Sequence, residues 1–238
     1  MTFRLKRMAS PRAWKLPRKG TKWVKRPAPG PHPQEGALPL LLLLRDVRGV
    51  AHSAREASEI LRTGQVLVDH RPVKDLAHGV GLMDTVSFAA PLNEHYRILK
   101  DRRGKLILVP IPAAEAATKL GRVRRKTTLP GGQIEVTLHD GRNLIAPAKA
   151  TWRVGDTLQL ELPQQKVLGH YTLAPGHLAY VAGGSHVGET ARIDRIEVKN
   201  SPQPNRVHFA EGFSTIKEYV FVIGDTTPKL SLPEALDR

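Results

Sequence analysis

Residues 53–69, SAREASEILRTGQVLVD, change from helical to strand periodicity within a few residues. Ser53 followed by Glu56 has the spacing of a capping box, so a helix is expected to cover residues 54–62. Gly64 is expected to end it, because glycine is the usual residue just after a helix C-terminus. The apolar side chains of this helix fall on one face: Ala57, Ile60 and Leu61.

The flanks of this helix predict a helix–turn–helix followed by small strands. Residues 40–48 form a short apolar segment expected to be helical, and Gly49 with Val50 turns the chain. After the helix, residues 66–68 alternate as a strand, and residues 80–88 give a further strand. Asp84, which follows Met83 in this stretch, is expected to be a turn former before the strand residues Val86 and Phe88 rather than a buried acid.

From about residue 94 the chain consists mainly of short strand-like segments separated by turns. This spacing favours one or two small β-barrels over a parallel sheet. A short helix is expected at residues 113–120. The expected strands are 96–99, 106–110, 134–138, 142–146, 157–162, 166–173, 178–181, 189–198, 206–209 and 219–223.

The first 34 residues carry ten Lys and Arg and no Asp or Glu, with Trp14, Trp23 and six prolines between them. Such a segment buries too little apolar surface to offset its ordering entropy, so it is expected to be disordered when free. Its composition suits a folded polyanion whose grooves it can enter. The basic residues are Arg4, Lys6, Arg7, Arg12, Lys15, Arg18, Lys19, Lys22, Lys25 and Arg26.

The overall charge is concentrated in that segment. The net charge is +15, and the rest of the chain has 27 Lys and Arg against 22 acids. Such concentrated positive charge indicates binding to nucleic acid or to an acidic membrane surface. Membrane binding would require an amphipathic helix, and the prolines of this segment break any long helix. The apolar run Leu38–Leu44 is far short of the roughly 20 residues that span a bilayer. The absence of cysteine excludes disulfides and thiolate metal sites, and it is compatible with a reducing cytoplasm.

No catalytic constellation is found. Residues 183–190 match the spacing of a P-loop, but Glu189 occupies the lysine position and strand-like residues follow where a helix is required. The histidines are scattered without metal-ligand spacing. The sequence therefore predicts no catalytic residue, no metal, no cofactor and no small-molecule substrate.

Two further groups of basic residues lie outside the N-terminal segment. Composition alone leaves open whether they form a solvated charged face or contact phosphates. Five cations within residues 119–126 repel one another unless something acidic lies close. The first group is Arg45, Arg48, Arg55, Arg62, Arg71 and Lys74, and the second is Lys119, Arg122, Arg124, Arg125 and Lys126.

Several stretches occur in an order that covers nearly the whole chain. LKRMASPRAWKL (5–16) carries L-K-R, A-x-P and W-x-L at a distinctive spacing. The others are RPAPGPH (26–32), LPLLLLLR (38–45), ILRTGQVLVD (60–69), VGLMDTVS (80–87), KLGRVRRK (119–126), GHLAYVAGGSHVG (176–188), VFVIG (220–224) and LSLP (230–233). Together they resemble the archaeal and eukaryotic small-subunit ribosomal protein family "S-four-e".

The resemblance implies an α+β, mostly β fold in successive parts. These are a basic extended arm and linker (1–39), an S-four-type helix–turn–helix RNA-binding domain (40–90), a central β-rich domain (91–170), a KOW-type SH3-like barrel (171–225) and a tail (226–238). It also implies a structural protein of the small ribosomal subunit, in the cytoplasm, with rRNA and neighbouring ribosomal proteins as partners. The basic residues given above, with Trp14 and Trp23 as stacking or gap-filling groups, become the candidate rRNA contacts.

Two other functions stay open. S-four-type modules are fused to pseudouridine synthases, which would make the protein an RNA-modifying enzyme, but the large mixed domain with a catalytic Asp is not found. KOW modules also occur in factors, which would make it a non-ribosomal RNA-binding regulator.

Overall fold

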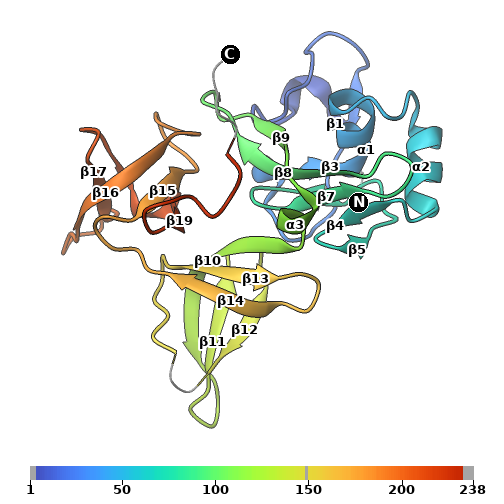
Figure 1. Ribbon diagram of the computed structural model, residues 1–238. Coiled ribbons are helices and arrows are strands. Elements are labelled where there is room, and N and C mark those ends of the chain that lie inside the picture. The colour runs from blue at the N-terminus through green and yellow to red at the C-terminus, as the bar shows by residue number, and fades with distance from the viewer. Residues whose placement is uncertain (1–3, 148–149, 233–238) are drawn as a thin grey trace. The chain divides into compact units, whose positions relative to one another are not determined.

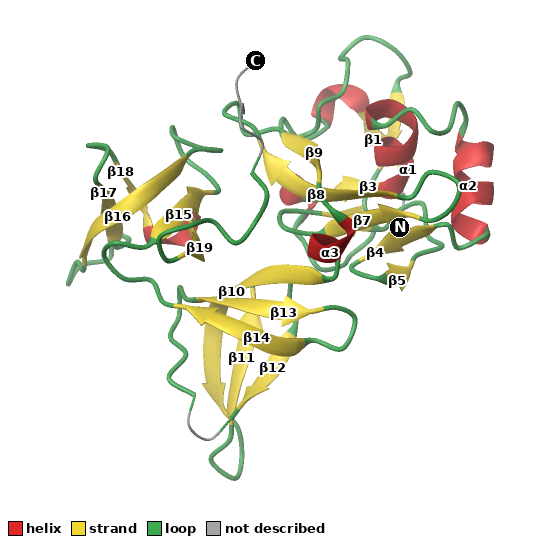
Figure 2. Cartoon of the chain, in the orientation of Figure 1, coloured by secondary structure: helices red, strands yellow, loops and turns green. Residues whose placement is uncertain are grey.

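The computed structural model describes residues 4–147 and 150–232 (Figure 1). The chain divides into two units, one formed by Met1–Lys100 and Lys105–Lys119, the other by Asp101–Gly104 and Leu120–Arg238. Strands make up most of the regular structure, with few helices (Figure 2). The expected mostly β class is therefore confirmed. No helix in the described ranges has the length and apolarity to cross a bilayer.

The first unit is built on an antiparallel sheet of order β5-β4-β7-β8-β9. Its register places Val68 opposite Val86, and Val86 opposite Tyr96. A two-stranded pair, β3 (Leu38–Pro39) with β6 (Gly79–Val80), lies in the same unit. The sheet strands are β4 (Val66–Val68), β5 (Arg71–Pro72), β7 (Thr85–Phe88), β8 (Glu94–Lys100) and β9 (Leu106–Pro110).

Two helical segments occur where the sequence predicts them. Leu40–Leu42 (α1) continues as a π-helix over Leu43–Val47 (η3), and all five leucines from 40 to 44 are buried. The second helix, α2, covers Ala54–Arg62. The Glu56 N–H donates to Ser53 Oγ at 3.2 Å, and the Glu56 carboxylate accepts from the His52 N–H at 2.8 Å. Ala57 and Leu61 are buried, so the amphipathic face predicted for this helix is confirmed.

The N-terminal segment, residues 4–39, folds onto the same core. Strands β1 (Arg4–Lys6) and β2 (Trp23–Lys25) pair antiparallel, and short 3-10 turns follow at Arg7–Ala9 (η1) and Gln34–Gly36 (η2). Trp14 and Val24 are each 4% exposed within the cluster that contains the α1 leucines. The Trp14 Nε1–H donates to the Ala37 carbonyl at 2.8 Å.

For residues 4–34, these contacts correct the expectation that the segment is disordered when free. That expectation treated the segment as if it were alone, and its few apolar residues are indeed too few to form a core. They are enough to complete one that the neighbouring sheet and helices already supply. A main-chain bond from the Leu106 N–H to the Ala13 carbonyl, at 2.7 Å, adds to the attachment.

The second unit contains two five-stranded sheets. The first has the order β12-β11-β10-β13-β14 and packs around Val123, Val136, Leu138, Trp152, Leu158 and Leu160. The second has the order β18-β17-β16-β15-β19, with every residue of β19 buried. The strands are β10 (Thr118–Thr128), β11 (Ile134–Leu138), β12 (Asn143–Ala146), β13 (Thr157–Glu161), β14 (Lys166–Tyr171), β15 (Leu178–Val181), β16 (Thr190–Glu197), β17 (Arg206–Phe209), β18 (Ser214–Ile216) and β19 (Val220–Gly224), with a 3-10 turn η4 at Lys217–Tyr219.

The helix expected at residues 113–120 is shorter than predicted. Helix α3 covers only Ala113–Ala116, and Thr118 already begins strand β10. The alanine-rich sequence favours a helix, but pairing of the following residues in the sheet overrides that local preference.

Candidate nucleic-acid interface

Most cations of the N-terminal segment are presented to solvent from a folded scaffold. Trp23 is 44% exposed on β2, and the Lys22 ammonium lies 5.6 Å from its ring centroid. Lys25 is half-buried, and Arg4 belongs to β1 but its side chain lies outside the description. The exposed cations are Lys6, Arg12, Lys15, Arg18, Lys19, Lys22 and Arg26.

Two predicted contact residues of this segment, Arg7 and Trp14, face inward instead. Arg7 is 8% exposed, and its guanidinium donates to the carbonyls of Pro17 and Thr21 and to the Thr21 hydroxyl at 2.8–2.9 Å. It therefore closes the loop between β1 and β2. Trp14 is buried and already hydrogen-bonded, so it has no face for a base. The structure removes both from the candidate RNA contacts.

The arginines around α1 and α2 are largely paired with acids. Arg45 contacts Asp46 at 2.8 Å, Arg62 contacts Glu59 at 2.7 Å, and Arg48 contacts Glu94 at 2.7 Å. Hydrogen bonds from Arg48 and then from Tyr96 lower the pKa of the Glu94 carboxyl. These ion pairs reduce the positive field of this region. The remaining members of the group, Arg55, Arg71 and Lys74, are exposed.

The second group of basic residues is split by a β-bulge in strand β10. Val123 is opposite Leu138 and Arg125 is opposite Thr137, so Arg124 is the extra residue. A bulge changes the direction of the side chains around it, and Arg124, Arg125 and Lys126 are all exposed. Arg122 is half-buried and donates to the carbonyls of Glu218 and Val220, and burial lowers the pKa of its guanidinium. These bonds hold Arg122 against β19 and the turn before it, and its contact with RNA stays a prediction.

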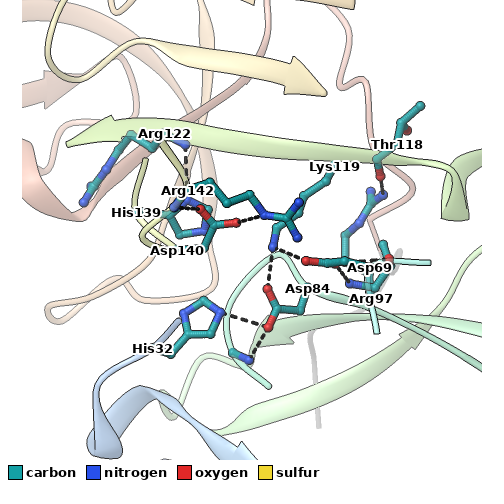
Figure 3. Close-up of polar contacts among 12 residues, drawn as sticks. His32, Asp69, Asp84, Arg97, Thr118, Lys119, Arg122, His139, Asp140 and Arg142 are labelled. Atoms are coloured by element: carbon teal, nitrogen blue, oxygen red, sulfur yellow. Dashed lines mark hydrogen bonds and ion pairs between the residues drawn. The ribbon is translucent and has the colours of Figure 1, made fainter. Parts of the chain in front are cut away.

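Lys119 lies in a buried polar network of the first unit (Figure 3). Its side chain is 1% exposed, and its Nζ lies 2.7 Å from Asp69 Oδ2 and 2.6 Å from Asp84 Oδ1. His32 Nε2 lies 2.9 Å from the other oxygen of Asp84. Lys119 is thus a structural residue and not an RNA contact, and Asp84 is the buried acid that the sequence did not predict.

The network joins three distant segments of the chain. His32 comes from the N-terminal segment, Asp69 follows β4, and Lys119 lies in β10. Both carboxylates also accept backbone bonds, from the Thr85 N–H at 3.0 Å and from the Gly81 N–H at 2.8 Å. Beside them, the fully buried Arg97 donates to the Thr118 carbonyl at 2.8 Å (Figure 3). The ion pairs and hydrogen bonds of Lys119, Asp69 and Asp84 explain how these three charges remain inside.

Stability is expected to depend on pH through Asp84. Burial raises the pKa of this carboxyl, but Lys119 and His32 outweigh burial and hold the pKa far below its ordinary value of 3.8. The ionised group therefore stabilises the fold above about pH 4, and this contribution is lost as the pH falls below that value. Urea midpoints measured from pH 7 to pH 2 are expected to fall less steeply for Asp84→Asn than for the wild type. If the urea midpoints of both proteins fall equally steeply with pH, carboxyl groups other than Asp84 cause the loss of stability in acid.

Three family models match successive parts of the chain. An RS4NT domain matches residues 1–35, an S4 domain matches residues 42–86, and the model described as "Ribosomal family S4e" matches residues 92–167. The protein named small ribosomal subunit protein eS4 of Methanocaldococcus jannaschii is 44% identical, with 96% of each chain covered. The chain belongs to the ribosomal family S4e. The predicted resemblance is thus confirmed. Because the family is one of ribosomal proteins, the alternative of an RNA-modifying enzyme is not supported.

Other members of the S4e family are similar over most or nearly all of the chain. The eS4 protein of Picrophilus torridus is 38% identical and 99% of each chain is covered. The crystal structure of the 30S ribosomal protein S4e from Thermoplasma acidophilum has a TM-score of 0.72 and 37% identity, and covers 83% of this chain and 99% of that one. Within the described ranges, no three His, Cys, Asp or Glu side chains group as a metal-binding set.

Proposed function

We propose that this S4e member is a structural constituent of the small ribosomal subunit that binds folded rRNA. The observation that carries the proposal is the near full-length similarity to proteins named small ribosomal subunit protein eS4. The dense cations of the N-terminal segment support it, because phosphate neutralisation supplies much of the affinity for nucleic acid. The ribosome is the cytoplasmic assembly that this function implies, with neighbouring small-subunit proteins as further partners.

The N-terminal segment is the principal contact surface in this proposal. Most of its cations are exposed on a scaffold that is already folded, so RNA binding does not have to order the whole segment. Trp23 offers an exposed ring for stacking. The proposed contacts are Arg4, Lys6, Arg12, Lys15, Arg18, Lys19, Lys22, Trp23, Lys25 and Arg26, with Arg55, Arg71, Lys74, Arg124, Arg125 and Lys126 as additional contacts and Arg45, Arg48 and Arg62 where RNA displaces their acids.

We also propose the finer assignment of parts. The two helical segments at 40–62 would be the helix–turn–helix of the S-four-type domain (40–90), followed by the central domain (91–170). The sheet of β15–β19 would be a KOW-type SH3-like barrel (171–225) with Gly183–Gly188 as its loop. Residues 226–232 of the proposed tail are described, and residues 233–238 lie outside the described residues.

The salt dependence of rRNA affinity tests the proposed contact surface of the N-terminal segment. If about six phosphates are neutralised, log affinity for small-subunit rRNA is expected to fall with log salt at a slope near −5. Replacing Arg12, Arg18 and Arg26 with alanine is expected to reduce the slope by about 3, since each contact contributes roughly 0.9. The matched control replaces Arg192, Arg195 and Arg206, which are equally exposed. Their part of the chain, residues 171–232, has six Lys and Arg and six acids.

Sucrose-gradient sedimentation separates this function from a regulatory factor. A structural protein is expected to co-sediment with small subunits and to remain bound after a moderate salt wash. Release by that wash, or a salt slope near zero for the wild type, would contradict the proposal.

A further inference from the structure

The turn between β8 and β9 belongs with the second unit although its strands belong to the first. Residues Asp101–Gly104 join the unit that contains β15–β19. The reason is a close approach to Gly188: a Cβ placed there would lie 2.8 Å from the Asp101 carbonyl carbon and 3.0 Å from the Arg102 nitrogen. Val187 also lies beside Gly104, 3.7 Å from where a Cβ would be. Only glycine at position 188 allows the two backbones to come so close.

The turn presents two guanidinium groups on a fixed backbone. Asp101 Oδ1 accepts from the Arg103 N–H at 2.8 Å, and the Gly104 N–H donates to the Asp101 carbonyl at 2.9 Å. Residues 100–105, KDRRGK, contain four cations and a single acid. Arg102 and Arg103 are both exposed, and the Arg103 side chain has no hydrogen bond or ion pair to any residue that the structure describes.

The 183–188 loop that receives this turn is held by its own packing. A Cβ on Gly183 would lie 2.8 Å from the Tyr219 ring, and the His186 ring stacks on Phe213 with centroids 4.1 Å apart. Gly184 and Ser185 are exposed, and their N–H groups donate to none of the described residues. The loop thus adds backbone donors on two exposed residues, three and four positions before the Gly188 contact with the turn.

We propose that residues 101–104 and 183–188, the turn–loop surface, form a second RNA-contacting surface in which Arg102 and Arg103 bind phosphates. The inference rests on the proposed rRNA-binding function and adds a site to it. Guanidinium groups suit phosphates because their planar donors match the phosphate oxygens, and backbone N–H groups of a glycine loop bind anions in the same way. The docking at Gly188 fixes the position of both arginines before RNA arrives.

The charge test compares two double variants. Arg102→Ala with Arg103→Ala is expected to reduce the salt slope for full-length small-subunit rRNA by about 2. Hydroxyl-radical footprinting is expected to show one set of nucleotides losing protection, while nucleotides that depend on Arg12, Arg18 and Arg26 stay protected. The control, Arg195→Ala with Arg206→Ala, removes the same charge and is expected to change neither readout.

The position test uses glycines of similar backbone conformation. Gly188 has φ +85 and Gly176 has φ +87, but a Cβ on Gly176 would meet nothing within 4 Å. Gly188→Ala is expected to lose the same footprint as the arginine double variant although every charge is kept, and Gly176→Ala is expected to retain it. If the arginine double variant matches the wild type while Arg12, Arg18 and Arg26 variants weaken binding, the turn–loop surface is refuted and the proposed function stands. If the wild type binds no rRNA, both fail.

Discussion

Lys119→Met is expected to lower the free energy of unfolding of the first unit by about 3–5 kcal/mol, the range for removing one partner of a buried ion pair. The change leaves Asp69 and Asp84 facing each other in an interior where each is at most 5% exposed. Their mutual repulsion and lost solvation are then compensated less completely, although His32, the neighbouring Arg97, the Thr85 hydroxyl and the backbone donors remain. Urea denaturation followed by tryptophan fluorescence measures the effect.

Two further variants separate burial from charge. Lys126→Met removes the same charge from an exposed position of the same strand, where the ammonium donates to the Trp152 carbonyl at 3.2 Å, and is expected to lower stability by about 0.5–1.5 kcal/mol. Combining Lys119→Met with Asp69→Asn and Asp84→Asn removes all three charges and is expected to recover part of the loss. Equal effects of Lys119→Met and Lys126→Met would contradict the structural role assigned to the network.

Local signals were sufficient for the helix at 54–62 and for several strands. Three signals lie within a few residues of one another: the Ser53 and Glu56 spacing, the apolar face and Gly64. The helix in the structure has the predicted bounds, residues 54–62. The strands at 178–181 and 206–209 also match their predicted ranges. Such features depend on neighbours in sequence, so the sequence contains the information directly.

The roles of individual cations depend on distant partners and could not be predicted in the same way. Lys119 and Lys126 have equivalent sequence surroundings, but the first reaches carboxylates 50 and 35 residues away. Arg48 is paired with Glu94, 46 residues away. The sequence therefore shows which regions are rich in cations. Which of those cations remain available to RNA depends on the acids that the fold brings next to them.

Trp14→Ala is the second change with a large expected effect, about 3–5 kcal/mol lost from the stability of the first unit. The indole is 4% exposed among the α1 leucines and donates to Ala37. Its loss would leave a cavity and free the segment before it. Trp14→Phe keeps most of the ring and is expected to cost about 1–3 kcal/mol, because the Ala37 carbonyl loses its donor.

Limited proteolysis shows whether Trp14 attaches the N-terminal segment. The wild type is expected to resist cleavage within residues 4–34, and Trp14→Ala is expected to be cut there at Lys and Arg by trypsin. Trp23→Ala is the matched control, since that indole lies in the same segment but is 44% exposed. Rapid cleavage of the wild type, or equal cleavage of both variants, would restore the interpretation of this segment as a free arm.

The same variants test whether prior folding of the segment contributes to RNA affinity. Trp14→Ala keeps every cation, so the salt slope for rRNA is expected to remain that of the wild type. The affinity is expected to fall more than tenfold, because fixing each released residue costs about 1–2 kcal/mol and about 1.4 kcal/mol is a factor of ten. Trp23→Ala can lose only a stacking contact of about 1–3 kcal/mol and leaves the segment folded. The decisive result is that Trp14→Ala, and not Trp23→Ala, has an unchanged salt slope, a reduced affinity and new trypsin sites. It would mean that the buried tryptophan contributes to RNA binding by holding the cations in place.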